Sequence, residues 1–250
     1  MKKLVYESLG GFGNTLFGIF RALKDSDQVI LRSFLEITDD MRSLLNFIFN
    51  DRVICTSERV FSQSWLSNPH FSENRKYKDG EVVEGFNQVM PSLELILHYR
   101  SLINPSIIPT DYVAIHVRRG DFLLPQNSKK HATMDINYYR KAMSMFPKDT
   151  KFIIVTDDRK WCEENFTNVD YSGGDLIGDF KTLLSASKGV IYGNSSFGYF
   201  GALLNPNKDK LVVACKNWYK LGFNDWNKSY GVLYPENYPD KLKLINYLFV

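Results

Sequence analysis

Two adjacent arginines, Arg118 and Arg119, come directly after the hydrophobic stretch YVAIHV at 112–117. A guanidinium group is always charged, and its planar fork of N–H donors matches the oxygens of a phosphate group. The pair could therefore hold the diphosphate of a nucleotide. The same charges could instead form salt bridges with Asp121 or with another surface acid, and the residue types alone leave both interpretations open.

A second group of candidate ligands for an anion is the segment GNSSFGYFGALLN at 193–205, which follows the strand-like KGVIY and opens a helix. The first turn of a helix offers unpaired N–H groups and the positive end of the dipole to anions. Ser195 and Ser196 would add hydroxyl groups at that point. The alternative is a plain serine N-cap, which is common.

A third candidate is the glycine-rich segment GGFGNTLF at 10–17, which again lies between a predicted strand and a predicted helix. Glycines at such a place let the backbone approach a ligand closely. The segment has neither the GxGxxG pattern of a dinucleotide site nor the Lys-Ser/Thr of a P-loop. An NAD-type Rossmann enzyme is therefore disfavoured, and we expect the segment to face the other two across a cleft between domains.

Other arrangements that could do chemistry have weaker support. Asp25 and Asp27 form a DxD pattern, which binds metal in some sugar transferases, but they lie in a polar turn. The acids at 157–158 end a predicted strand and could face a cleft or cap the next helix. The four histidines have no spacing typical of metal ligands, and no Ser-His-Asp order or nucleophile elbow is present.

The elements that would position these residues alternate between strands and helices. Strands are expected at 3–8, 28–34, 52–57, 81–86, 112–117, 151–157, 188–193 and 210–215. Helices are expected at 14–24, 38–49, 91–103, 136–146, 159–166, 179–187, 196–205 and 240–249. Thr38 is the expected N-cap of the second helix, and the third is expected to begin at Pro91. This alternation predicts an α/β fold with parallel sheets. Ligands of such folds bind beyond the carboxyl ends of the strands.

The proline-containing segment at 104–111 is the best candidate for a linker. It suggests two Rossmann-like halves that face a cleft. We place the N-terminal half at 1–107 and the C-terminal half, which holds the arginine pair and the segment at 193–205, at 108–250. The helix expected at 240–249 is a candidate to pack back on the N-terminal half.

Composition limits the class of protein. The chain has 250 residues, of which 44% are hydrophobic and 24% are charged, so a disordered or fibrous protein is excluded. A net charge of +3 without a basic stripe does not indicate a nucleic-acid partner. No apolar run is long enough for a transmembrane helix, and no secretory leader is expected. Three widely spaced cysteines suggest neither a disulfide framework nor a zinc site, and we expect a cytoplasmic protein.

Six segments together resemble a known family. In chain order they are GGFGNTLF, EGFNQ, IHVRRGDF, NYYRKAM, IIVTDDRKWCEENF and DFKTLLSASKGVIYGNSSFGYFGALLN. Their order and spacing resemble the α-1,2-fucosyltransferases, a group like glycosyltransferase family 11 within the fucosyltransferase superfamily. The resemblance is dense over 112–205 and thinner before it. It implies a GT-B fold, with the half at 1–107 on the acceptor side and the half at 108–250 binding the nucleotide sugar. It also implies a GDP-fucose donor, a glycan acceptor, inversion at the anomeric carbon, and no metal or other cofactor.

The resemblance also implies roles for single residues. Arg118 would bind the β-phosphate of GDP and stabilise it as it leaves, because an enzyme without a metal needs a fixed cation at that position. Arg119 would support the same loop. His116 and Asp179 match positions that contact the nucleotide in related enzymes, with Asp179 at the guanine. Further donor contacts are implied for Gly11, Gly13 and Asn14 in the N-terminal half and for Asn194, Ser195, Ser196 and Phe197 after the strand at 188–193.

The sequence departs from the family at two places. The family has Gln where this chain has Thr15, and it has Ser-Trp-Trp where this chain has Gly-Tyr-Phe at 198–200. Both departures lie where the acceptor or the transferred sugar would be recognised. A different nucleotide sugar, such as a rhamnosyl or xylosyl donor, therefore remains an alternative, as does a non-catalytic relative that binds a nucleotide sugar or a glycan.

An inverting transfer also needs a group that accepts the proton of the acceptor hydroxyl. Asp121 is the first candidate because it follows the arginine pair, although its carboxylate could instead hold one of the arginines in place. His131 and Asp135 are the runners-up. The oligomeric state does not follow from the sequence.

Overall fold

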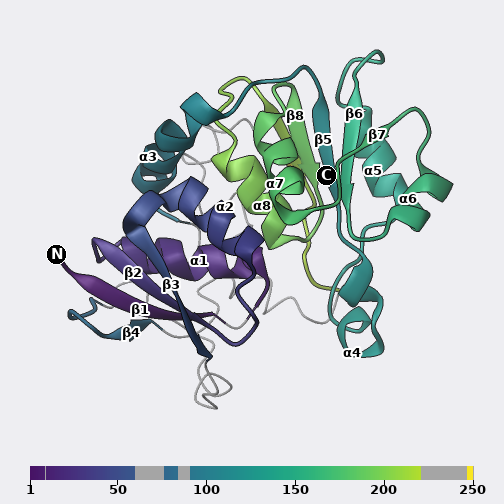
Figure 1. Ribbon diagram of the computed structural model, residues 1–250. Coiled ribbons are helices and arrows are strands. Elements are labelled where there is room, and N and C mark those ends of the chain that lie inside the picture. Colours follow the sequence, from purple (N-terminus) through teal and green to yellow (C-terminus); the bar gives the residue numbers. More distant parts are fainter. Residues whose placement is uncertain (9, 60–75, 84–90, 221–246, 250) are drawn as a thin grey trace. The chain divides into compact units, whose positions relative to one another are not determined.

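The computed structural model describes residues 1–8, 10–59, 76–83, 91–220 and 247–249 (Figure 1). The chain divides into two compact units, of which the first takes in Met1–Ile103 and the second begins at Asn104. The division lies at the start of the predicted linker. Each unit is built on its own parallel sheet, so the predicted α/β class with parallel strands is confirmed.

The first unit has a four-stranded parallel sheet in the order β3-β2-β1-β4. Its strands are β1 (Lys3–Ser8), β2 (Gln28–Ser33), β3 (Val53–Arg59) and β4 (Val82–Val83). Its helices are α1 (Phe12–Leu23), α2 (Asp39–Phe49) and α3 (Leu93–Ile103), with a 3-10 turn at Asn50–Arg52. The elements lie where the sequence predicts them, apart from shifts at the ends. The predicted strand at 81–86 extends beyond the described residues after Val83.

The helices of the first unit meet in an aromatic cluster. Phe20 of α1, Phe49 of α2 and Tyr99 of α3 pack edge to face, with ring centroids 4.8 to 5.6 Å apart. Edge-to-face packing is a favoured arrangement of aromatic rings, and burial of three such rings stabilises the layer. Thr38 caps α2 as predicted, because its hydroxyl accepts a hydrogen bond from the Met41 amide at 3.2 Å.

The second unit has a six-stranded parallel sheet in the order β10-β9-β8-β5-β6-β7. Its strands are β5 (Val113–Val117), β6 (Phe152–Thr156), β7 (Asp170–Tyr171), β8 (Gly189–Tyr192), β9 (Leu211–Ala214) and β10 (Tyr247–Phe249). Its helices are α4 (Pro125–Ser128), α5 (Ile136–Met143), α6 (Arg159–Asn165), α7 (Leu176–Ser185) and α8 (Ser196–Leu204). Short 3-10 turns lie at Asn104–Ser106 and Gly120–Leu123. The short elements α4 and β7 were not predicted.

Strand β5 is central in this sheet and is buried on both faces. Val113, Ile115 and Val117 pack in one hydrophobic cluster with residues of α5 and α6. His116 points the other way, because alternate side chains of a strand face opposite sides, and it contacts α8. In Figure 1, α7 and α8 lie to the left of β5 and α5 and α6 lie to its right.

Two helices begin at residues other than the predicted ones because a polar side chain caps them. Helix α3 begins at Leu93 and not at Pro91, since the Ser92 hydroxyl accepts a hydrogen bond from the Leu95 amide at 3.3 Å. Helix α7 begins at Leu176, three residues before the predicted start, because the Asp175 carboxylate accepts from the Gly178 amide at 2.7 Å. Asp179 therefore lies in the first turn of α7.

The helix predicted at 240–249 is wrong in its described part. Tyr247–Phe249 forms β10, which pairs in parallel with β9, with Leu248 opposite Val213. Residues 240–246 lie outside the described residues. Aromatic side chains favour strands, and the exposed edge of β9 offers the backbone hydrogen bonds that a short terminal segment needs. The end of the chain thus extends the sheet of the second unit.

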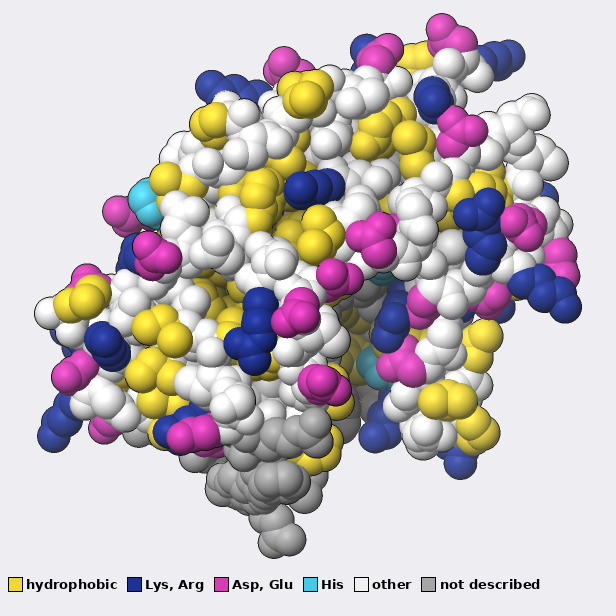
Figure 2. Space-filling view, in the orientation of Figure 1, with side chains coloured by type: hydrophobic (Ala, Val, Ile, Leu, Met, Phe, Trp, Pro, Cys, Tyr) yellow, Lys and Arg dark blue, Asp and Glu magenta, His cyan; other side chains and the backbone are white. Residues whose placement is uncertain are grey.

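The surface carries mixed charge. On the face shown in Figure 2, basic and acidic side chains are interspersed over the described residues and do not gather into one basic surface, consistent with the net charge of +3. None of the helices in the described ranges has the length and apolar character needed to cross a membrane.

Candidate active site

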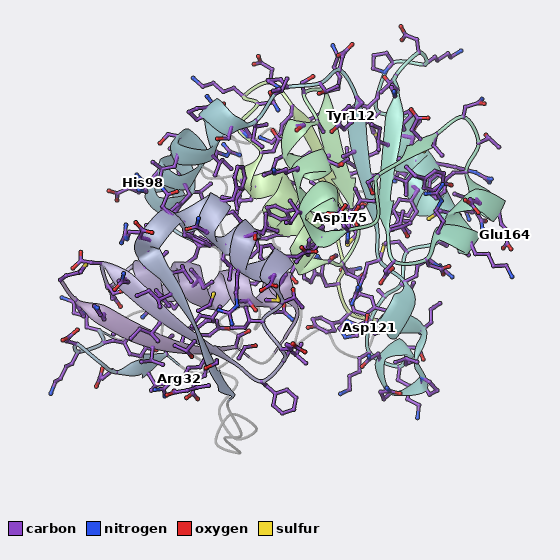
Figure 3. All side chains as sticks on the ribbon, viewed as in Figure 1. Arg32, His98, Tyr112, Asp121, Glu164 and Asp175 are labelled. Carbon is purple, nitrogen blue, oxygen red and sulfur yellow. The ribbon has the colours of Figure 1, made fainter. Side chains whose placement is uncertain are left out.

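Arg118 follows the carboxyl end of β5, and two carboxylates share its guanidinium group. Its Nη1 lies 2.7 Å from Oδ2 of Asp157, and its Nη2 lies 2.6 Å from Oδ1 of Asp121. The side chain of Arg118 remains 37% exposed. Figure 3 shows Asp121 at this end of β5, with Tyr112 at the opposite end. The salt bridge that the sequence left as an alternative is therefore present, on a group that still faces solvent.

Asp157 joins the loop after β5 to the end of β6. Its Oδ1 accepts a hydrogen bond from the backbone amide of Arg119 at 2.8 Å. A Cβ on Gly120 would lie 2.6 Å from Oδ2 of Asp157, so a larger residue there would push this carboxylate out of its position. Val117 is paired with Thr156 in the sheet, which brings the two strand ends side by side. From the sequence, Asp157 is a weaker candidate that could face a cleft or cap the next helix. Asp158 is the residue that caps α6, and Asp157 lies at the arginine loop. The shared end of two adjacent parallel strands is the signal that could have placed it there.

Arg119 is held in the structure by a different set of contacts. Its guanidinium carbon lies 3.9 Å from the centre of the Trp161 ring, and its Nε lies 3.1 Å from Oδ2 of Asp158. The side chain is 15% exposed. Asp158 also caps α6 by accepting from the Trp161 amide at 3.2 Å. These contacts are those of a residue that supports the loop. The guanidinium group of the neighbouring Arg118 is paired with two carboxylates and lies 5.6 Å from the centre of the Phe122 ring, but it is more exposed, at 37%.

His116 is buried between β5 and α8. Its ring lies 5.3 Å from that of Phe197, and a Cβ on Gly198 would lie 3.0 Å from its Nδ1. Burial lowers the pKa of His116 to about 4, against an opposing effect of the negative charge of Asp157. The imidazole is therefore neutral at physiological pH, and its Nδ1 has no hydrogen-bond partner among the described residues.

The start of α8 lies level with the arginine loop. His116 is paired with Tyr192, so the residues that follow β5 and β8 emerge at the same edge of the sheet. Ser195 has an extended backbone, and its hydroxyl makes no capping hydrogen bond, which differs from the plain N-cap interpretation. The amides of the first turn, which begins at Ser196, point out of a helix end of the kind that binds anions.

Asn194 has a structural contact. Its side chain is 2% exposed, and its Nδ2 donates a hydrogen bond to the Trp218 carbonyl at 2.9 Å. The segment at Trp218 is in turn joined to the loop after the arginines, since the Ala132 amide donates to the same carbonyl at 3.1 Å. Asn194 thereby connects the turn before α8 to that loop.

Asp179 lies in the first turn of α7 and is half-buried. Its Oδ1 accepts hydrogen bonds from the Ser172 hydroxyl and, at 3.2 Å, from the Gly174 amide. Burial raises the pKa of Asp179, while these hydrogen bonds act in the opposite direction. The predicted contact with guanine remains a prediction.

The glycine-rich segment GGFGNTLF belongs to the first unit and forms the start of α1. Gly11 is the N-cap residue, Gly13 is buried within the helix, and the side chain of Asn14 lies against Gly10. The Thr15 hydroxyl is buried and lies 2.6 Å from that of Ser8 at the end of β1. Thr15, which departs from the family pattern, thus joins the strand to the helix.

The other proton-acceptor candidates have structural partners. Asp135 caps α5 by accepting from the Tyr138 amide at 3.0 Å. The ring of His131 is stacked on that of Phe122 at 4.2 Å, and burial lowers the pKa of this histidine. Asp121 is bound by Arg118 and is 47% exposed.

The DxD pattern also has structural partners. Asp25 forms an ion pair with Arg21 at 2.8 Å, and Asp27 accepts a hydrogen bond from the Lys2 amide at 2.7 Å. Among the residues that the structure describes, no three or more His, Cys, Asp or Glu side chains come together as a group that could hold a metal ion.

Comparisons with known proteins point to one family. The sequence profile described as Glycosyl transferase family 11 matches residues 98–232, which is more than half of the chain and includes the whole arginine loop and α8. No solved structure matches the chain.

Curated relatives match over part of their length. The O-antigen biosynthesis glycosyltransferase WbnK of Escherichia coli is 31% identical over 134 residues, which cover 45% of this chain and 43% of the relative. Galactoside alpha-(1,2)-fucosyltransferase 1 of Rattus norvegicus is 34% identical over 112 residues, which cover 39% of this chain and 29% of the relative. An Alpha-1,2-colitosyltransferase of E. coli is 24% identical over 168 residues, covering 62% and 54%. The matched region thus spans less than half of the first two relatives.

Proposed function

Because the chain belongs to glycosyl transferase family 11, we propose that it transfers a sugar from a nucleotide donor, L-fucose from GDP-fucose, to a hydroxyl group of a glycan. The observation that carries this proposal is Arg118 at the end of β5, beside the first turn of α8 at the end of the adjacent β8. A fixed cation and a helix N-terminus at one edge of a parallel sheet suit the two phosphates of a nucleotide diphosphate.

In the proposed reaction, the oxygen of the acceptor hydroxyl attacks the anomeric carbon from the face opposite the diphosphate. The bond from that carbon to the phosphate oxygen breaks, and GDP leaves with the electron pair. Arg118 stabilises the charge that grows on the β-phosphate, which is why no metal ion or other cofactor is part of the proposal. The proton of the acceptor passes to a carboxylate, for which Asp121 is the candidate.

The remaining site residues have supporting roles in the proposal. The amides of α8 and the hydroxyls of Ser195 and Ser196 bind phosphate oxygens, and Asp179 binds the guanine. His116 contributes a neutral ring, because its pKa of about 4 leaves it without charge at neutral pH. The GT-B arrangement, in which Gly11, Gly13 and Asn14 of the first unit contact the donor across a cleft, is also part of the proposal.

A colitosyl donor is a second candidate, since one matched relative is named for colitosyl transfer. Colitose is fucose without the hydroxyl on carbon 3. A site that hydrogen-bonds this hydroxyl would reject colitose strongly, whereas a site that merely tolerates it would accept both sugars.

Thermal unfolding of the full chain tests the nucleotide. We expect GDP and GDP-fucose to raise the melting temperature, with or without EDTA, and UDP, TDP and NAD to leave it unchanged. Stabilisation by UDP or TDP would overturn the donor assignment, and no response to any nucleotide would contradict the proposed site. Transfer assays with GDP-fucose and GDP-colitose then separate the two donors, and Arg118→Ala serves as the inactive control.

A further inference from the structure

The two carboxylates that share Arg118 are held in different ways. Asp157 accepts from Nη1 of Arg118 at 2.7 Å and, through its other oxygen, from the Arg119 amide at 2.8 Å. It follows directly on β6, and its carboxylate lies over Gly120, where a Cβ would come within 2.6 Å of Oδ2 and displace it. Asp157 cannot leave Arg118 without breaking the contact that orders the loop.

Asp121 is attached more loosely. It belongs to the 3-10 turn at Gly120–Leu123, outside the sheet. Its side chain is 47% exposed, compared with 27% for Asp157. Its carboxylate contacts Nη2 of Arg118 at 2.6 Å and makes no other hydrogen bond or ion pair within the described ranges. Only the backbone carbonyl of Asp121 is held further, by Nδ2 of Asn127 at 2.9 Å and the Leu124 amide at 3.2 Å. A partly exposed ion pair of this kind contributes little to stability, so breaking it costs little.

Arg118 cannot form ion pairs with both carboxylates and a diphosphate at the same time. Two negative charges already surround one positive charge, and a diphosphate brings at least two more. Like charges at such distances repel, so one carboxylate must give way when the phosphate binds. The carboxylate outside the sheet, without a second anchor, is Asp121.

We propose that Asp121 occupies the position on Arg118 that the donor diphosphate takes, while Asp157 stays bound and aims the guanidinium group. Asp157 is then a positioning residue, and donor binding is an exchange of one anion for another on Nη2. This inference rests on the proposed function, because it presumes that the anion is the diphosphate of a nucleotide. The exchange also frees the Asp121 carboxylate, which is the candidate proton acceptor, only when a donor is present.

The test is a double-mutant cycle on GDP binding, measured by isothermal titration calorimetry with the full chain. Asp121→Asn removes the competing charge and keeps the side chain's size, so it should tighten GDP binding about two- to fivefold, the scale of one partly exposed ion pair. In an Arg118→Lys background, the same substitution should have little effect. The lysine ammonium group has no separate Nη1 and Nη2 with which to hold Asp157 and Asp121 side by side, so the competition for Nη2 is lost. Asp170→Asn is the matched control, since Asp170 is an exposed, lysine-paired acid of the same unit; it should leave GDP binding unchanged.

The possible results separate the two proposals. Tightening by Asp121→Asn in the wild-type background alone supports the exchange. Equal tightening in both backgrounds would show a general repulsion and overturn it, as would unchanged or weaker binding. If the wild-type chain does not bind GDP, the proposed function itself fails. The Asp157→Asn variant checks the positioning role. If Asp157 aims Arg118, the kcat of this variant at saturating donor should fall even where it still binds GDP.

Discussion

Arg118 and Arg119 show how two identical, adjacent side chains take different roles. Successive residues beyond a strand point in different directions, so one arginine lies over Trp161 and pairs with Asp158, while the other projects from the sheet edge toward Asp121 and Asp157. Arginine suits both tasks, because its flat face stacks on aromatic rings and its edge presents a fork of donors. Residue type alone could not assign the two roles.

The division of roles predicts different effects of two substitutions. Arg118→Ala should lower kcat/KM about 10²- to 10³-fold, the scale of losing one group that stabilises transition-state charge, with little change in stability. Arg119→Ala should lower the free energy of unfolding by about 1–2 kcal/mol through the lost stacking and ion pair. Urea unfolding and steady-state kinetics on both variants measure this. A fully stable Arg119→Ala enzyme with the larger kinetic defect would reverse the assignment.

The buried His116 predicts a dependence of stability on pH. Its pKa is lowered from 6.5 to about 4 in the folded chain, so between these values the unfolded chain binds the extra proton. Stability therefore rises with pH across this window and is lost on acidification, by about 3 kcal/mol from pH 6.5 to 4. Urea unfolding of wild type and His116→Gln at several pH values should show a shallower decline in the variant. If the free energy of unfolding falls equally with pH in wild type and His116→Gln, then the pKa of His116 is not lowered in the folded chain and the prediction is wrong.

At the scale of elements, the sequence predicts what depends on local pattern. Alternating strands and helices, the parallel sheets and the Thr38 cap all follow from periodicity and residue type. The start of α7 was missed because the Asp175 cap begins the helix three residues early. Gly178 lies in this first turn, and glycine does not favour a helix prediction. The terminal strand β10 was missed because its partner, β9, is remote in sequence, and pairing with a sheet edge overrides the helical pattern.

The same reasoning explains which site residues were found. Arg118 and Ser195 carry their chemistry in their own type and place after a strand. Asp157 acts through contacts with two residues of the loop after a neighbouring strand. Asn194 was named from the resemblance as a donor contact, but its hydrogen bond to the Trp218 carbonyl was not foreseen. Such contacts depend on which strands lie next to each other in the sheet, and a single sequence does not reveal that order.

The close approach of α8 to the sheet predicts the effect of adding one methyl group. A Cβ on Gly198 would lie 2.7 Å from Cβ of Tyr192 and 3.0 Å from Nδ1 of His116, both in strands that cannot shift freely. Gly198→Ala should therefore destabilise the chain by about 1–3 kcal/mol and move the start of α8 outward. Thermal unfolding checks the first effect and GDP titration the second, where weaker binding is expected. Wild-type values for both would show that α8 moves away without cost.

At the scale of the whole molecule, the two units differ in how they relate to the family. The match over residues 98–232 takes in all elements from β5 to β9, whereas α1 and its glycine-rich start lie outside it. The diphosphate contacts of the proposed site come from the second unit. In the proposed function Asn14, at the start of α1, is a candidate contact of the donor from the first unit, and we propose that this contact is with the sugar.

This assignment predicts that Asn14→Ala discriminates between two ligands. GDP-fucose and GDP share the nucleotide and differ in the sugar, so a residue that contacts only the sugar side should affect one and not the other. We expect Asn14→Ala to weaken GDP-fucose binding about five- to tenfold, the scale of one lost hydrogen bond to a polar ligand, and to leave GDP binding unchanged. Arg118→Ala should weaken both ligands, since the diphosphate is common to them. Asn46→Ala, at an exposed asparagine of α2 in the same unit, should change neither. Equal losses for GDP and GDP-fucose in Asn14→Ala would instead place Asn14 at the nucleotide, and no loss for either would remove the start of α1 from the donor site.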